Sequence, residues 1–174
     1  MMTLTSVFWM YVILFGIIGG FRGWAKELLA IFAILLAIAI DTVLLTYVDS
    51  VRIIMTSRPG ITQFALRAGL LLTLTYFGYQ TPNLPAFANS KFAREKLQDF
   101  LLGGALGLVN GYFLAGSIWY YMHQANYPLP YVTAPTDMAA TQAYMKYMPP
   151  MLFGIPNIYF AIIAAFVFVI IVFV

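Results

Sequence analysis

Long apolar runs separated by shorter polar stretches dominate the hydrophobic pattern of this chain. An α-helix rises about 1.5 Å per residue, so about twenty apolar residues cross the hydrocarbon of a bilayer. The pattern therefore predicts an all-α integral membrane protein, a bundle of about five transmembrane helices with the lipid bilayer around it. The predicted spans are Leu4–Gly20, Leu28–Val48, Ile61–Tyr79, Phe100–Met122 and Phe153–Val174.

The segment between the last two spans differs in kind from the rest of the chain. His123–Pro150 is rich in proline, tyrosine and methionine, and this makes it too apolar for a free linker. We expect it to lie along the membrane surface, with a short helix near Asp137–Tyr147. It either packs on its own bundle or docks onto a partner, and the sequence favours neither. The chain thus divides into a four-helix core (1–123), an extramembrane loop (124–150) and a C-terminal transmembrane helix (151–174).

Small residues recur at four-residue spacing in two of the predicted spans. In an α-helix this spacing places them along one stripe, where another helix can approach closely. We expect the two spans to pack tightly, either within this chain or against a partner. The stripe residues are Gly103, Gly107, Gly111 and Ala115 in the fourth span, and the pairs Gly16 with Gly20 and Gly19 with Gly23 at the end of the first.

Composition and charge narrow the class of protein further. Hydrophobic residues make up 63% of the chain and charged residues only 9%, which a soluble domain of this length could not hide. The net charge of +3 comes from basic residues in short loops. This pattern is typical of residues that set the topology of a membrane protein, and it gives no reason to expect nucleic-acid binding. The absence of cysteine excludes disulfides and cysteine nucleophiles. The first run lacks a basic n-region and a small-residue cleavage site, so we expect it to be retained as a span.

The basic residues also predict an orientation. Arg22, Lys26, Lys91, Arg94 and Lys96 fall on one side of the predicted bundle. Arg52, Arg58 and Lys146 fall on the other side. By the positive-inside rule, the N-terminus lies outside the cytoplasm and the C-terminus inside.

Three polar residues fall inside predicted spans. Asp41 lies near the end of the second span and Arg67 near the start of the third, so antiparallel helices would place them at one depth. They form either a structural ion pair or part of a functional polar path. Asn110 lies midway along the fourth span and needs a hydrogen-bond partner there, which another helix or a substrate would supply.

His123 is the single histidine and stands at the edge of the fourth span, in an aromatic stretch. It fits the aromatic belt at the membrane surface, and it is also a weak candidate ligand for a metal or a chlorophyll-type pigment. No catalytic triad, zinc-binding helix motif or phosphate loop is recognisable in the sequence, so we expect no enzymatic activity. We predict no cofactor beyond that pigment or a quinone.

Two segments carry short glycine-rich motifs: Gly20–Leu29, with Arg22, Gly23 and Glu27, and Asp99–Gly111. The first resembles the first loop of the colicin V production family, and the second resembles the last core span of that family. The order of four helices and the loop lengths also match over residues 1–123. In this chain Asn110 stands where the family pattern usually has arginine.

The resemblance implies a bacterial inner-membrane protein linked to peptide-toxin export and envelope homeostasis, without established enzymatic activity. With the added loop and last helix, we expect a scaffold or accessory subunit that binds other membrane subunits. The alternatives are a small transporter or channel component with a polar path through Asp41, Arg67 and Asn110, and a pigment- or quinone-binding subunit that uses His123.

Overall fold

A computed structural model describes residues 3–57, 60–80 and 93–173, and all the regular secondary structure in these ranges is helical. The predicted all-α fold class is therefore confirmed. The helices are α1 (Leu4–Arg22), α2 (Trp24–Tyr47), α3 (Asp49–Ser57), α4 (Ile61–Tyr79), α5 (Ala93–Gln124), α6 (Met138–Met145), α7 (Pro149–Leu152) and α8 (Asn157–Phe173).

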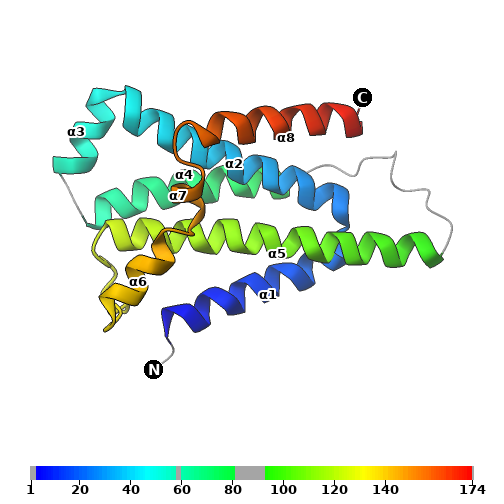
Figure 1. The fold of residues 1–174 in the computed structure, drawn as a ribbon, viewed down its shortest axis with the longest axis horizontal. Helices are drawn as coiled ribbons and strands as arrows, with labels where there is room; N and C mark the ends of the chain where they lie inside the picture. The colour runs from blue at the N-terminus through cyan, green and yellow to red at the C-terminus, as the bar shows by residue number, and fades with distance from the viewer. Residues whose placement is uncertain (1–2, 58–59, 81–92, 174) are drawn as a thin grey trace.

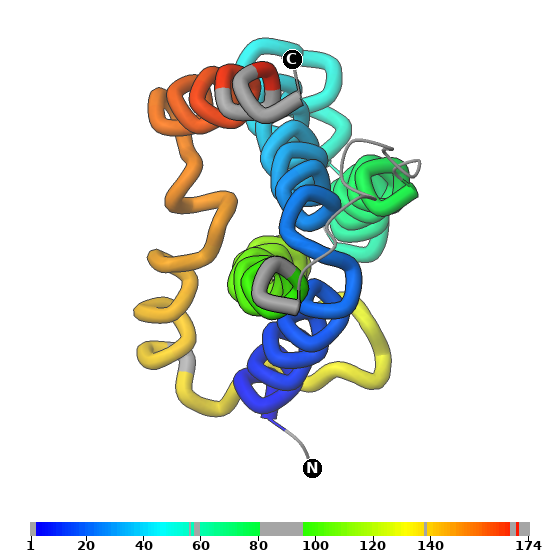
Figure 2. The backbone as a smooth tube through the Cα atoms, turned by 90° about the vertical axis from the view of Figure 1, so that its right-hand side faces the viewer, coloured from blue at the N-terminus to red at the C-terminus, as the bar shows by residue number. Residues whose placement is uncertain are grey.

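The long helices run alongside one another, and α5 lies in the middle of the bundle (Figures 1 and 2). Helix α1 packs on α5, α2 packs on both α4 and α5, and α8 covers the outer side of α2. Helices α3 and α6 both lie at the end of the bundle where α1 begins (Figure 1). The junction of α1 with α2 and the start of α5 lie at the opposite end. The two sets of basic residues that the sequence analysis assigns to opposite sides of the bundle lie at these two ends. Arg58 and Lys91, one from each set, lie outside the described residues.

Three helices in the described part of the chain are long and apolar enough to cross a membrane. They comprise α1, α2 and the stretch Lys96–Gln124 of α5. Helix α4 has the predicted bounds, but Gln63 and Arg67 lower its hydropathy. Helix α8 has 17 residues, a length of about 25 Å that falls short of a hydrocarbon core of about 30 Å. The structure thus supports a membrane protein with three clear spans, and the fifth predicted span begins later, at Asn157 instead of Phe153, because α7 precedes it.

A sharp break at Gly23 separates α1 from α2. Gly23 has φ +88°, a conformation that residues with a side chain rarely adopt. A Cβ atom there would also meet the Asp99 carboxylate at 2.8 Å. The same carboxylate accepts a hydrogen bond of 3.0 Å from the backbone N–H of Trp24, the first residue of α2. Helix α2 therefore begins at Trp24, four residues before the predicted start at Leu28.

The glycines of α1 and α5 lie against each other. A Cβ on Gly103 would come 2.4 Å from the carbonyl oxygen of Gly19, and one on Gly107 would come 2.3 Å from that of Phe15. Gly111 meets the backbone of Val12 in the same way. Only glycine permits this approach of two backbones, so the stripe on α5 has its partner in α1 of the same chain.

An aliphatic core lies where α2, α4, α5 and α8 meet. It is built from Ile34 and Ile38 of α2, Leu71 of α4, Leu114 of α5 and Ile158 of α8. The spacing of Leu71 and Arg67, and of Ile34 and Ile38, by four residues places each pair on one helix face. The residues of the core therefore lie on the same helix faces as the polar residues.

The segment after α5 folds back onto the bundle. Tyr127, Met145 and Met148 are buried in a cluster with Phe8 of α1 and Trp119 of α5. The short helix expected near Asp137–Tyr147 is α6, and the Asp137 side chain caps it by accepting a hydrogen bond from Ala140 N–H.

Helix α3 is an element that the sequence analysis does not predict. It follows α2 directly and is strongly amphipathic, with Asp49 and Arg52 paired on its surface. Its isoleucines Ile53 and Ile54 are exposed. A helix of this kind at the end of a membrane bundle suits the membrane surface.

Candidate functional site

The break at Gly23 creates a buried polar site, which we call the glutamate cluster and define as Arg22, Glu27, Tyr79 and Asn110. Glu27 is fully buried and forms an ion pair with Arg22. The Arg22 guanidinium also donates a hydrogen bond of 3.1 Å to the Tyr79 carbonyl oxygen, and it lies 4.1 Å from the centroid of the Tyr79 ring. One arginine thereby connects α1, α2 and α4.

Asn110 brings α5 into the same cluster. Its amide nitrogen Nδ2 donates to Glu27 Oε2 at 2.7 Å and to the Glu27 carbonyl oxygen at 2.9 Å. The Tyr79 hydroxyl donates to the same Oε2 at 3.3 Å. The Glu27 carboxylate therefore receives an ion pair and two further hydrogen bonds, which offset its removal from water. The Oδ1 atom of Asn110 is buried without a hydrogen-bond partner among the described residues.

A second buried site, the aspartate cluster, consists of Asp41, Arg67 and Tyr121. Arg67 Nε donates to both carboxylate oxygens of Asp41 at 3.1 Å, and its NH2 group donates to Oδ2 at 2.7 Å. The guanidinium lies 4.2 Å from the centroid of the Tyr121 ring. Both charged side chains are at least nine-tenths buried. A bidentate pair that also stacks on an aromatic face is a rigid connection between α2, α4 and α5.

The two clusters are well separated. Glu27 and Asp41 stand fourteen positions apart on α2, a rise of about 21 Å. The side chains of Ile34, Ile38 and Leu71 lie between them and are almost fully buried. The structure thus brings Asp41 together with Arg67 but places Asn110 in the other cluster. A polar path through all three residues would have to cross an aliphatic layer.

His123 lies at the end of α5, where its Nδ1 is 3.1 Å from the Tyr127 hydroxyl. Tyr127 follows the membrane-spanning part of α5, and burial raises the pKa of its hydroxyl. The hydroxyl therefore stays protonated at neutral pH and holds the imidazole in place. Within the part of the chain that the structure describes, no three metal-binding side chains come together.

Several tyrosines at this end of the molecule face outward. Tyr131 is 97% exposed and Tyr147 is 67% exposed, although Met145 and Met148 beside Tyr147 are buried. The Tyr112 hydroxyl donates to the Tyr147 carbonyl oxygen, and the Trp119 ring stacks on Tyr144. The segment is thus attached to α5 while Tyr131, Tyr144 and Tyr147 remain accessible.

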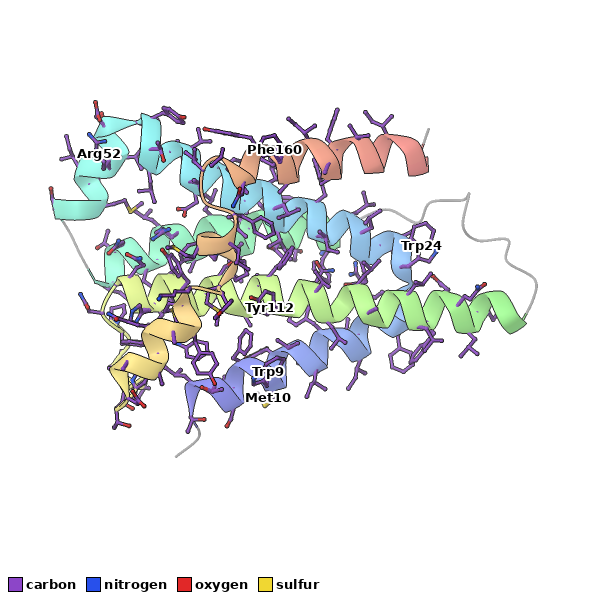
Figure 3. The ribbon with its side chains drawn as sticks, in the orientation of Figure 1. Trp9, Met10, Trp24, Arg52, Tyr112 and Phe160 are labelled. Atoms are coloured by element: carbon purple, nitrogen blue, oxygen red, sulfur yellow. The ribbon has the colours of Figure 1, made fainter. Side chains whose placement is uncertain are left out.

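The outer faces of the bundle are apolar. Trp9 and Met10 on α1 and Phe160 on α8 are exposed on the outside of their helices (Figure 3). Apolar side chains on the outside are expected where helices meet lipid.

Sequence reasoning noted the family-like residues Arg22, Gly23, Glu27 and Asp99 without a physical reason for their association. The structure places all four at the junction of α1 with α2. Sequence reasoning missed Tyr79 and Tyr121 as members of the clusters. A tyrosine at the end of an apolar run is usually interpreted as a residue of the membrane interface. The sequence therefore does not indicate which side chain such a tyrosine contacts.

Comparison of the chain with protein-family models, with curated protein sequences and with solved structures finds no match in any of the three. The resemblance to the colicin V production family therefore depends on the motif residues and on the order of the helices.

Proposed function

We propose that this chain is a non-catalytic subunit of a larger bacterial inner-membrane assembly, in which it acts as a scaffold or accessory protein. The observation that carries the proposal is the segment 125–148, in which Met145 and Met148 anchor the chain to the bundle while Tyr131 and Tyr147 are exposed. Tyrosine supplies large, rigid contact area and is enriched in protein interfaces. A fixed segment of this kind suits a constant partner.

The buried charges support a structural role. Glu27, Asp41 and Arg67 are the buried charged residues in the described ranges, and each has an ion-pair partner in this chain. Their hydrogen bonds tie together α1, α2, α4 and α5. Buried ion pairs of this kind stabilise one arrangement of the helices. They therefore support a rigid scaffold more directly than a protein that changes its conformation in each cycle.

The membrane assignment follows from the helix type and the charge pattern. Helical spans are typical of the bacterial inner membrane, because outer-membrane proteins are closed β-barrels. The larger set of basic residues lies at the end with the α1–α2 junction, which we assign to the cytoplasm. The N-terminus then lies outside and the last helix runs inward. The family-like motifs add a link to export or envelope homeostasis as the setting of the assembly.

Co-purification tests this function. After extraction in a mild detergent, we expect the chain to elute with partner subunits in a fixed stoichiometry. Replacing both Tyr131 and Tyr147 with alanine should release the partner without changing the thermal stability of the chain. Tyr76→Ala is a matched control, since Tyr76 is 61% exposed on α4, away from the segment.

Two outcomes would reject the scaffold function. One is a wild-type chain that runs as a lone monodisperse monomer. The other is equal loss of the partner in the Tyr76→Ala control. Labelling of a cysteine at Asp41 by a water-soluble maleimide would instead favour the small transporter, because it requires water at that depth.

A further inference from the structure

A groove about 370 Å³ in volume lies among α1, α4 and α5. Its walls include Leu4 and Phe15 of α1, Leu72 of α4, and Leu114 and Met122 of α5. Its lining is almost entirely apolar, and its volume falls in the usual range of ligand sites, about 300–1,000 Å³.

The glycine contacts explain why the groove is there. Helices α1 and α5 touch backbone to backbone at Gly19, Gly103 and Gly107. From that contact they diverge toward the beginning of α1 (Figure 1). On one side the space between them is filled by Met145 and Met148. On the α4 side, Leu72 is the one described residue that lines the groove.

The length and position of the groove match one leaflet of a bilayer. Along α1 the lining extends from Leu4 to Phe15, which is about 16 Å, and along α5 from Leu114 to Met122, which is about 12 Å. Half of a hydrocarbon core of about 30 Å is about 15 Å. The groove begins at the first residue of α1, at the end of the bundle, and ends near mid-depth. An acyl chain in one leaflet occupies this same range of depth.

We propose that this groove is a specific binding site for one acyl chain of a phospholipid, taken from the leaflet that faces the N-terminal end of α1. The lipid fills space that the tilted α1 leaves open, so it completes the packing of α1 on α4 and α5. The hydrocarbon chain of the lipid is the part that the groove recognises.

The test compares two leucines of α4 that are about equally exposed and differ in whether they line the groove. Leu72 lines the groove and is 47% exposed, whereas Leu66 does not line it and is 49% exposed. The wild-type chain and the variants Leu72→Trp and Leu66→Trp are reconstituted in vesicles of phosphatidylethanolamine and phosphatidylglycerol that also contain an isoprenoid quinone. They are then extracted in mild detergent and analysed by native mass spectrometry.

We expect about one phospholipid to remain bound to the wild-type chain and to Leu66→Trp, and at least a fivefold lower occupancy in Leu72→Trp. Circular dichroism checks that both variants fold. If Leu72→Trp does not fold, Val7→Trp fills the groove from α1, with Ile13→Trp on the outer face of α1 as its control. Equal occupancy in all variants, no retained phospholipid, or retention of the quinone in its place would overturn the proposal.

Discussion

At the residue scale, the buried charged side chains are stabilised by specific partners. Arg67 meets both oxygens of Asp41 and stacks on Tyr121. Glu27 is paired with Arg22 and receives the Asn110 amide. Removing one member of such a pair leaves a buried charge alone, which costs far more than the pair contributes when intact.

Breaking the aspartate cluster should reveal strong coupling. We expect Asp41→Asn and Arg67→Ala each to lower the free energy of unfolding by about 3–5 kcal/mol. The double variant should lose at least about 1 kcal/mol less than the sum of the two, because the second change removes the stranded charge. Unfolding by an anionic detergent in mixed micelles measures these values. The exposed pair of Asp49 and Arg52 on α3 is the control, with effects expected within about 1 kcal/mol. Additive losses at Asp41 and Arg67 would contradict the coupling.

Asn110 offers a second test at this scale. Asn110→Leu keeps the approximate volume but withdraws a donor from the buried Glu27 carboxylate, so we expect a loss of about 1–3 kcal/mol in unfolding free energy. Val109→Leu, at the neighbouring exposed position, should change the stability by less than about 0.5 kcal/mol. Equal stability of Asn110→Leu and the wild-type chain would show that this amide is dispensable.

At the scale of the elements, the glycines of α1 and α5 decide how closely these two helices approach. The four-residue spacing of Gly103, Gly107 and Gly111 identifies the face of α5 that packs. The spacing does not say which helix occupies that face. In the structure, α1 of this chain occupies that face, so the glycine stripe of α5 is used within the chain.

Two neighbouring glycines of α5 give a matched pair for this contact. A Cβ on Gly107 would lie 2.3 Å from the Phe15 carbonyl oxygen, whereas one on Gly104 would lie 3.5 Å from its nearest neighbour. We expect Gly107→Ala to lose about 1–3 kcal/mol in unfolding free energy by overpacking. Gly104→Ala should be neutral or up to about 1 kcal/mol more stable, because alanine favours the helix. The same detergent titration measures both, and equal effects would contradict the backbone contact.

At the scale of the whole molecule, the bundle has two chemically different ends. One end carries α3 and α6, together with the segment that holds the exposed Tyr131 and Tyr147. The other end carries the α1–α2 junction and the start of α5 (Figure 1). The chain has no cysteine, so a single introduced thiol reports its own position. The two ends should therefore be distinguishable in intact cells.

Thiol labelling tests the topology. Ser50→Cys and Thr136→Cys should react with a membrane-impermeant maleimide in intact cells, since both lie at the end with α3 and α6. Gln98→Cys, near the start of α5, should react only after the membrane is permeabilised. Labelling of all three from one side would contradict the bundle spanning the membrane. The opposite pattern would reverse the orientation.

The sequence by itself determined the helical class, the approximate positions of the main helices and the faces that pack, because these depend on local periodicity and on the length of the apolar runs. The ends of the helices differ: α5 begins at Ala93 instead of Phe100, and α8 begins at Asn157 instead of Phe153. The sequence also indicated that Asp41 and Arg67 share a depth, since depth follows from counting residues along a helix. Only the tertiary structure decided which partners meet: that Glu27 binds Asn110, that Arg67 stacks on Tyr121, and that the glycine stripe of α5 receives α1. Those choices depend on how the helices cross. The crossing follows from many weak contacts summed over the bundle, which no single segment of sequence contains.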